Sequence, residues 1–597
     1  MDEKEKIKLE KISAEMAKAG EVMAKNFLEN FPSYLQSYQN FVTSYVNMSN
    51  HFFDKPDSMK KVQDSYMEYL QKQIELSKRI YERQQQNGTG YAPVISPADG
   101  DKRFKAPEWD ESPYYFDYIK QNYLLLSQLV SEIVNSVELE KKAQDKLNFF
   151  TKQFLDALSP SNFFATNPEA IRLAQITNGQ SVMDGFQNLL SDIQRGRISQ
   201  SDTNAFEVGK NLAISKGSVI YENELIQLIQ YEPTTENVME YPLVIFPPWI
   251  NKYYILDLMP GKSLVEFAVN QGYTVFMVSW RNPSKEMGYF SFDHYVKLGA
   301  LKAIEVARKI TGAKKVNTLG YCLGGTLQGI TLSILRGKGK KFEEAEQLKD
   351  SVASSTFLAA MLDFSDIGPM GSMIDETLVA KLENDLKDGG VLNGKDMAGA
   401  FNALRANELV WNYVVNNYLK GKTPPPFAVL YWTDDNTNLP AEMYKYYLRN
   451  LIFENKLSKK NVLKVCDTSL DLGAIDTPSF IIGTVEDHIS PCGTVFTTTE
   501  LVGGEVEYVL GDSGHIMGAN NPPSPNNKYH HRYGGTLGKG LDHWKKTASQ
   551  GTGSWWSYWE KWLRNKSGKQ VPALQKQGNK EFPIIEPAPG RYVKEKN

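Results

Sequence analysis

The sequence is poor in cysteine. Its 597 residues contain only three, Cys322, Cys466 and Cys492. An odd and sparse set excludes a disulfide framework of the kind that holds small secreted domains together. It fits a reducing cytoplasm better than an oxidising compartment, so we expect a cytoplasmic protein.

The sequence also lacks a strong excess of charge, since its formal net charge is −3. Because it has no basic stripe interleaved with aromatic residues, nucleic-acid binding is not expected. No apolar run reaches the 18 residues that favour a membrane-spanning helix, and the first residues lack the apolar core of a signal peptide. The sequence therefore predicts neither a transmembrane segment nor secretion by a signal peptide.

Motifs for metals and cofactors are missing as well. His530 and His531 are adjacent, without further ligands at metal-binding spacing. No glycine-rich dinucleotide or phosphate fingerprint is present. We therefore expect no metal and no bound cofactor.

The first part of the chain has helical character. Residues 1–85 carry a stripe at three- and four-residue spacing that includes Met67, Leu70, Ile74 and Tyr81. Residues 86–100 are rich in Gly, Pro and polar residues, which is typical of a linker. Helical patterns resume over residues 101–203. The sequence predicts an N-terminal helical segment, a linker and an all-α N-terminal domain.

From residue 204 to 597 the pattern changes to alternating strands and helices, which predicts a mostly parallel sheet. The expected strands are near-continuous apolar runs, as in strands covered on both faces: 243–246, 274–278, 316–319, 352–358 and 480–482. The alternation lapses over about 364–475, where helical and aromatic-rich pieces predict a cap insertion. Trp432 lies there; it is either a contact for substrate or polymer, or part of the cap core.

Cys322 lies in the segment Gly-Tyr-Cys-Leu-Gly-Gly, residues 320–325, after a predicted strand and before a predicted helix. The Gly-x-Ser-x-Gly nucleophile elbow of α/β-hydrolases has the same pattern with serine in the middle. The glycines permit a strained turn, and a helix N-terminus stabilises a thiolate. Cys322 is the candidate nucleophile, although free cysteine is more often a small buried hydrophobe.

The order of residues along the chain indicates the other members of a triad. In α/β-hydrolases the nucleophile is followed by an acid and then a histidine. Asp487 follows the predicted strand over residues 478–483, and His515 follows the last predicted strand over 506–510. The sequence predicts Asp487 as the orienting acid and His515 as the general base.

An oxyanion hole is expected to combine two backbone N–H groups. One is that of Leu323, the residue after the nucleophile. The other belongs to Trp249 or Ile250, because Pro247 and Pro248 have no N–H.

Three polar residues near these positions are pocket candidates. Asn251 and Asp257 follow the expected oxyanion residues, and their alternative role is to anchor the loop through local hydrogen bonds. His488 adjoins the acid and is expected to shape the pocket.

The sequence resembles the class I poly(3-hydroxyalkanoate) synthases from about Asp101 to the C-terminus. The matching motifs lie at residues 247–258, 279–283, 320–326, 432–440, 486–488, 513–516, 521–523 and 586–594. The resemblance implies an α/β-hydrolase fold with the catalytic triad at Cys322, Asp487 and His515. It also implies short-chain (R)-3-hydroxyacyl-CoA substrates, a growing polyester product and a homodimer at the surface of cytoplasmic polyester granules, where granule-associated proteins are possible partners.

A thioester donor explains why the nucleophile is cysteine. Transfer to a thiolate exchanges one thioester for another, so the acyl group stays activated, and coenzyme A is the leaving group rather than a cofactor. Two other functions remain open: a thioesterase or esterase that uses the same triad with water, and a non-catalytic protein that coats granules. The N-terminal helices are expected to pair chains or to touch the polymer surface; the alternative is a solvated tail.

Overall fold

The computed structural model describes Met48 and residues 56–86, 91–112, 114–337 and 342–596. The chain forms two compact units. One comprises residues up to Asp202 together with Ala400–Pro426, and the other comprises Thr203–Gly399 with Phe427–Asn597. The segment 400–426, within the predicted cap, thus belongs with the N-terminal helices. The predicted segment 1–85 lies largely outside the described residues.

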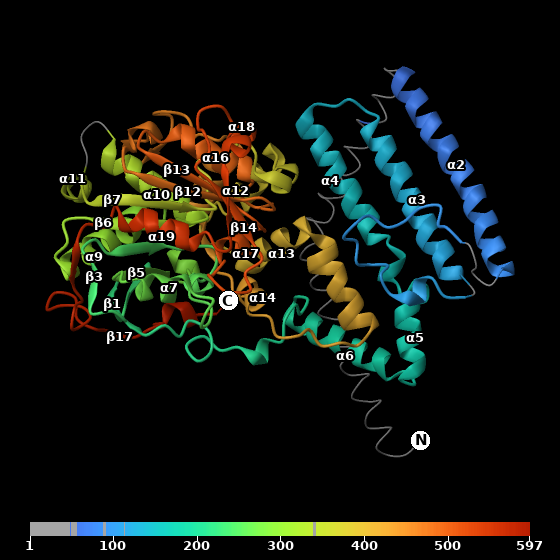
Figure 1. Ribbon diagram of the computed structural model, residues 1–597, viewed down its shortest axis with the longest axis horizontal. Coiled ribbons are helices and arrows are strands. Elements are labelled where there is room, and N and C mark those ends of the chain that lie inside the picture. The colour runs from blue at the N-terminus through green and yellow to red at the C-terminus, as the bar shows by residue number, and fades with distance from the viewer. Residues whose placement is uncertain (1–47, 49–55, 87–90, 113, 338–341, 597) are drawn as a thin grey trace, which may run out of the picture. The chain divides into compact units, whose positions relative to one another are not determined.

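The first unit is helical. Its main helices are α2 (Pro56–Gln85), α3 (Tyr115–Asn135), α4 (Lys141–Ala157), α5 (Pro168–Ile176) and α6 (Gln180–Arg195), with the π-helical turns η9 (Asn407–Trp411) and η10 (Val414–Leu419) from the later segment. Helices α2, α3 and α4 lie side by side (Figure 1). At Gly185 an added Cβ would lie 2.0 Å from the Tyr418 carbonyl oxygen, so α6 and η10 pack with their backbones in close approach.

Helix α2 packs against α3, and the Gln73 amide on α2 donates to Asn122 Oδ1 on α3 at 2.9 Å. Leu76 is fully buried, and Arg83 pairs with the buried carboxylate of Asp117 at 2.6 Å. The predicted stripe instead faces outward, because Met67 and Ile74 are 55% and 72% exposed. The stripe is therefore not the surface that packs α2 against α3.

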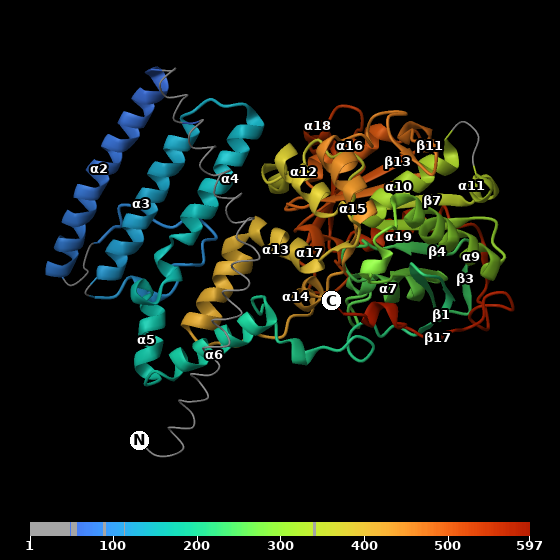
Figure 2. The same ribbon diagram turned by 180° about the vertical axis from the view of Figure 1, so that it is seen from behind.

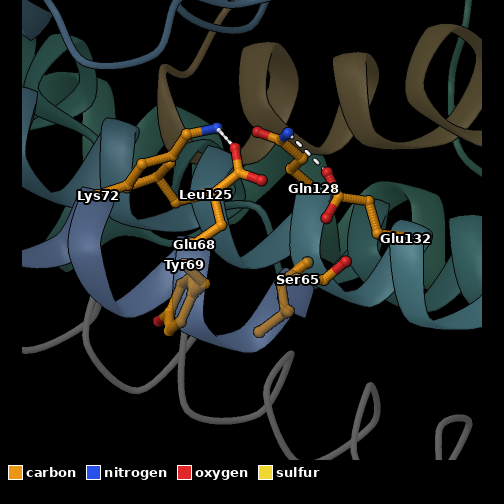
Figure 3. A pocket seen from close by; sticks show the side chains of 8 residues that line it. Ser65, Glu68, Tyr69, Lys72, Leu125, Gln128 and Glu132 are labelled. Carbon is orange, nitrogen blue, oxygen red and sulfur yellow. Dashed lines mark hydrogen bonds and ion pairs between the residues drawn. The ribbon is translucent and has the colours of Figure 1, made fainter. Parts of the chain in front are cut away.

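A shallow groove runs between α2 and α3 (Figure 3). Lys72 pairs with Glu68 at 2.7 Å on α2, and the Gln128 amide donates to Glu132 at 2.7 Å on α3. The polar side chains of this groove thus pair within their own helices.

The second unit is built on an eleven-stranded mixed sheet. In spatial order the strands are β15 (Ser549–Thr552), β14 (His530–Tyr533), β13 (Val506–Gly511), β12 (Ser479–Thr484), β7 (Val352–Leu358), β6 (Val316–Tyr321), β4 (Leu243–Phe246), β5 (Val275–Trp280), β2 (Ile226–Tyr231), β1 (Gly217–Glu222) and β17 (Glu586–Pro587). The six strands from β13 to β5 are parallel, and the strands at both edges pair antiparallel. The predicted parallel sheet is confirmed, with antiparallel edges added.

Helices cover both faces of this sheet (Figures 1 and 2). Helices α9 (Lys302–Thr311), α10 (Leu323–Arg336) and α16 (Cys492–Leu501) pack on one face. Helices α7 (Leu264–Asn270) and α19 (Trp556–Arg564) pack on the other. Alternate residues of β4 and β5 point into the two cores, as expected for buried strands. This is the doubly covered architecture of an α/β-hydrolase.

The part of the predicted cap that belongs to this unit contains short helices: α12 (Glu376–Asp385), most of α13 (Gly394–Leu404), α14 (Ala428–Asp434), α15 (Ala441–Tyr446) and the π-helical η11 (Tyr447–Phe453). Arg449 on η11 binds Glu376 at 2.8 Å and Glu383 at 2.6 Å, both on α12. The ribbon of β8 (Val391–Leu392) with β9 (Leu439–Pro440) joins the two parts of the cap that flank residues 400–426.

Candidate active site

Cys322 occupies a sharp turn between β6 and α10. Its backbone has φ 52° and ψ −124°, a conformation that costs a non-glycine residue about 1–3 kcal/mol. The turn is held by the Cys322 N–H, which donates to the Leu358 carbonyl at 2.9 Å, and by the Gly325 N–H, which donates to the Cys322 carbonyl at 2.9 Å. Strain that the surrounding structure maintains is typical of a nucleophile elbow.

Glycine is required at this elbow by close backbone contacts. A Cβ at Gly320 would lie 2.4 Å from the Gly325 Cα, and one at Gly324 would lie 1.9 Å from the Phe246 carbonyl oxygen. The start of α10 therefore touches the loop that follows β4. This contact brings together the two segments from which oxyanion donors are expected.

The three cysteines have different surroundings. Burial, with the Asp293 charge as a further contribution, raises the pKa of Cys466 to about 12. Burial also raises the pKa of Cys492. Both effects oppose thiolate formation. Cys322 differs from them in its place at the elbow and in its hydrogen bond with His515.

Asp487 and His515 form a buried pair. They follow β12 and β13, which are neighbouring parallel strands and therefore end at the same edge of the sheet. His515 Nδ1 lies 2.7 Å from Asp487 Oδ2. The other carboxylate oxygen accepts hydrogen bonds from the backbone N–H groups of Ile489 at 2.9 Å and Ser490 at 2.7 Å. The carboxylate is thus fixed in one orientation toward the imidazole.

The environment of His515 favours its charged form. Burial lowers the pKa of His515, but the charge of Asp487, charge on Cys322 and hydrogen bonds to both residues together raise the pKa well above its ordinary value. The Tyr321 ring stacks on the imidazole, with centroids 5.3 Å apart and planes at 27°. The imidazole thus interacts with Cys322 on one side and Asp487 on the other, which is an arrangement that can accept a proton from the thiol.

The predicted oxyanion residues lie on α10 and on the loop after β4, whose first residues contact the start of α10. Leu323 opens α10, so its N–H has no partner within the helix. On the loop after β4, the Trp249 carbonyl accepts from the Thr437 hydroxyl at 2.5 Å, and the Ile250 carbonyl accepts from the Thr437 N–H at 3.1 Å. These bonds tie the loop to the segment after α14. The choice between the N–H groups of Trp249 and Ile250 stays a prediction.

The candidate pocket residues have different hydrogen-bond partners and surroundings. The Asn251 amide donates to the Trp432 carbonyl at 3.3 Å, and the Trp432 indole donates to the Lys252 carbonyl at 2.6 Å. Asn251 and the largely buried Trp432 therefore join the loop to α14. His488 is half-buried beside Asp487.

Asp257 is buried. Its carboxylate accepts hydrogen bonds from the hydroxyls of Ser215 at 2.5 Å and Ser263 at 2.7 Å. Burial raises its pKa. This geometry supports the role of a loop anchor, which was one of the two roles expected from the sequence.

The surroundings of two neighbours of the site are not evident in the sequence. Tyr321 stacks on the imidazole, and the only indication of this in the sequence is its position directly before the nucleophile. Lys252 is 2% exposed, although a lysine in a polar loop normally indicates solvent exposure. No sequence pattern shows that an ammonium group is buried there.

Within the described ranges, no group of three or more His, Cys, Asp and Glu side chains is arranged to hold a metal ion. Over the same part of the chain, no helix is long and apolar enough to cross a membrane.

Comparison with known proteins supports a single family. Residues 100–268 match the N-terminus of poly-beta-hydroxybutyrate polymerase (PhaC), and residues 242–522 match the alpha/beta hydrolase fold. The poly(3-hydroxyalkanoate) polymerase subunit PhaC of Cupriavidus necator is 44% identical over 502 residues, which cover 83% of each chain. The poly(3-hydroxyalkanoate) polymerase of Methylorubrum extorquens is 42% identical over 84% of this chain and 82% of its own.

Among solved structures, the Paleococcus ferrophilus monoacylglycerol lipase covers 57% of this chain and 99% of its own, with 13% identity and a TM-score of 0.33. A TM-score this low supports no conclusion about this chain. The extent and identity of the sequence matches show instead that this chain belongs to the poly(3-hydroxyalkanoate) polymerase family.

Proposed function

We propose that this chain polymerises (R)-3-hydroxyacyl-CoA thioesters, chiefly 3-hydroxybutyryl-CoA, into polyhydroxyalkanoate and releases coenzyme A. The observation that carries the proposal is the buried His515–Asp487 pair directed at a cysteine elbow. It occurs in a chain 44% identical to a protein named as a polymerase of this polyester.

The first step is acylation of Cys322. His515 takes the thiol proton, and the Cys322 sulfur attacks the thioester carbonyl. The N–H groups of Leu323 and of Trp249 or Ile250 stabilise the developing oxyanion. The carbon–sulfur bond to coenzyme A then breaks, and the proton on His515 passes to the departing thiolate.

The second step is elongation. The 3-hydroxyl group of one acyl unit attacks the thioester carbonyl of another, with His515 as base and Asp487 holding the imidazole in one tautomer. An ester forms and a thiol is released, which is a downhill exchange. Water competes with the hydroxyl group, so the cap must limit its access.

The proposal needs no metal or resident cofactor, because every group in both steps belongs to this chain or to the substrate. The partners proposed for it are the growing polyester, the granule surface, a second copy of the chain and granule-associated proteins. The N-terminal helices are the proposed contact with them, since α2 carries the exposed apolar residues Met67 and Ile74. The proposed location is a cytoplasmic granule.

Two alternatives make different predictions. A thioesterase would release coenzyme A and free hydroxy acid without polymer. A coating protein would release nothing, although its strained cysteine elbow and buried imidazole–carboxylate pair would then have no use.

The test is to incubate the purified protein with (R)-3-hydroxybutyryl-CoA and to measure coenzyme A, free acid and polymer together. We expect about one ester unit in polymer for each coenzyme A released. Free acid in place of polymer would contradict the proposal and favour the thioesterase.

A further inference from the structure

The loop that carries the expected second oxyanion donor contains a buried ammonium group. Lys252, two residues after Ile250, is 2% exposed, and burial lowers its pKa to about 8, with the nearby charges of Asp435 and Lys596 acting in opposite directions. Its Nζ donates to the main-chain carbonyl of Glu595 at 2.7 Å. A buried ammonium without a partner is costly, so this bond is needed where Lys252 lies.

The side chain of Glu595 fixes the segment that supplies this carbonyl. The Glu595 carboxylate accepts from the Asn282 N–H at 3.2 Å and pairs with Arg281 Nε at 3.4 Å. Arg281 and Asn282 directly follow β5, the strand next to β4. Glu595 therefore connects the end of β5, through its side chain, with the loop after β4, through its carbonyl.

Contacts on either side of Glu595 hold the same segment in place. Lys596 Nζ lies 2.9 Å from Asp435 Oδ1, and the other oxygen of Asp435 accepts from the Tyr254 hydroxyl at 3.0 Å. Tyr592 is buried, its N–H donates to the Gln227 side chain at 3.1 Å, and its hydroxyl donates to the Asn223 carbonyl at 2.8 Å.

We infer that Glu595 is a positioning residue for the reaction, because its carbonyl holds Lys252 and thereby fixes the backbone N–H groups of Trp249 and Ile250 relative to the elbow. The inference rests on the proposed function, since it assigns a role within the same acylation step. Lys252 and Glu595 touch no reacting atom. They act through the placement of the loop.

Other contacts fix the start of the loop, where the Trp280 indole donates to the Pro247 carbonyl at 2.9 Å and the Trp249 ring packs against Phe292. The carbonyl groups of the loop at Trp249, Ile250 and Lys252 bond to the segment around α14, which belongs to the cap region. The contact through Lys252 links the later part of the loop, through Glu595, to the end of β5 in the sheet on which the elbow itself is built. Placement errors of about 1 Å in a catalytic group can cost about 100-fold in rate, so a small displacement of the loop is measurable.

The test uses the full chain with four single variants. Lys252→Met removes the ammonium directly, and Glu595→Ala releases the segment that meets it. Glu595→Gln is the conservative variant, because its amide oxygen still accepts from the Asn282 N–H. Lys594→Ala is the matched control, since Lys594 is the exposed neighbour of Glu595.

Two quantities are measured with (R)-3-hydroxybutyryl-CoA: the pre-steady-state rate constant for coenzyme A release, and the final fraction of Cys322 that is acylated. We expect Lys252→Met and Glu595→Ala to lower the rate constant about tenfold or more, with the acylated fraction unchanged. Glu595→Gln should recover most of the rate, and Lys594→Ala should stay within about twofold of the unaltered protein.

A purely structural role gives the reverse result: a smaller acylated fraction with an unchanged rate constant. That result, or unchanged values in both Lys252→Met and Glu595→Ala, would overturn the inference while the unaltered protein still releases coenzyme A. If the unaltered protein releases none, the proposed function itself fails, and the inference fails with it.

Discussion

Gly324→Ala is the substitution whose effect the structure defines most sharply. The added Cβ would lie 1.9 Å from the Phe246 carbonyl oxygen and 2.8 Å from the Pro247 carbonyl carbon. Both are backbone atoms, so no side-chain rotation relieves the overlap. The loop after β4 and the start of α10 must move apart by more than 1 Å to restore even a 3.0 Å approach.

This movement separates the two expected oxyanion donors, because Leu323 lies on α10 and Trp249 and Ile250 lie on the loop. A misplacement of about 1 Å costs on the order of 100-fold in rate, so we expect the rate constant for acylation of Cys322 to fall by about that factor. Overpacking is expected to lower the free energy of unfolding by about 1–3 kcal/mol, which leaves the protein folded at room temperature.

The assay is pre-steady-state coenzyme A release from (R)-3-hydroxybutyryl-CoA, combined with thermal unfolding. Gly493→Ala is the matched control, because this exposed helical glycine on α16 has no atom within 4 Å of an added Cβ. The control should keep its rate and gain up to about 1 kcal/mol in stability. A Gly324→Ala protein that is folded and acylates Cys322 as fast as the unaltered protein would refute the assigned geometry of the oxyanion hole.

Three further predictions test other parts of the molecule. Cys322→Ala should abolish both covalent acylation and polymer formation without unfolding the protein, whereas Cys492→Ala should keep most activity; acyl label on the Cys322→Ala protein would contradict the assignment. Asp487→Asn should lower the pKa of His515, because burial then acts without the carboxylate charge, and ¹³C-histidine NMR measures that pKa. The same variant should allow some acylation but poor elongation, which coenzyme A release measures. An unchanged pKa of His515 would count against the pairing. Arg83→Ala should lower the free energy of unfolding of the helical unit by about 2 kcal/mol, because it removes one partner of a buried carboxylate, and unchanged hydrogen exchange in α2 and α3 would show that the pair contributes little.

The parallel part of the sheet was predictable from the sequence because its strands are buried on both faces. Runs such as 243–246 are continuously apolar, and this signal needs no knowledge of the neighbours. The edge strands β14 and β15 are more polar and pair antiparallel, so their place depends on contacts that a local pattern does not contain. The grouping of residues 400–426 with the N-terminal helices escaped prediction for a similar reason: an amphipathic helix does not indicate which unit covers its apolar face.

The candidate site was predictable where chain order and turn chemistry specify it. Cys322, Asp487 and His515 each follow a recognisable strand, and parallel strands bring their ends to one edge of the sheet. The environment of Lys252 was not predictable, because its partner is a main-chain carbonyl 343 residues away. Contacts of this kind leave no trace in residue type, so only the folded chain reveals them.

The most direct test of the central claim is to identify the residue that carries the acyl group. The protein is mixed with (R)-3-hydroxybutyryl-CoA, quenched with acid within the first turnover, digested, and analysed by mass spectrometry. The account predicts a hydroxybutyryl thioester on the peptide that contains Cys322, which forms as coenzyme A is released and then lengthens as further units add. Turnover without acylation of Cys322, or with the acyl group on another residue, would contradict it.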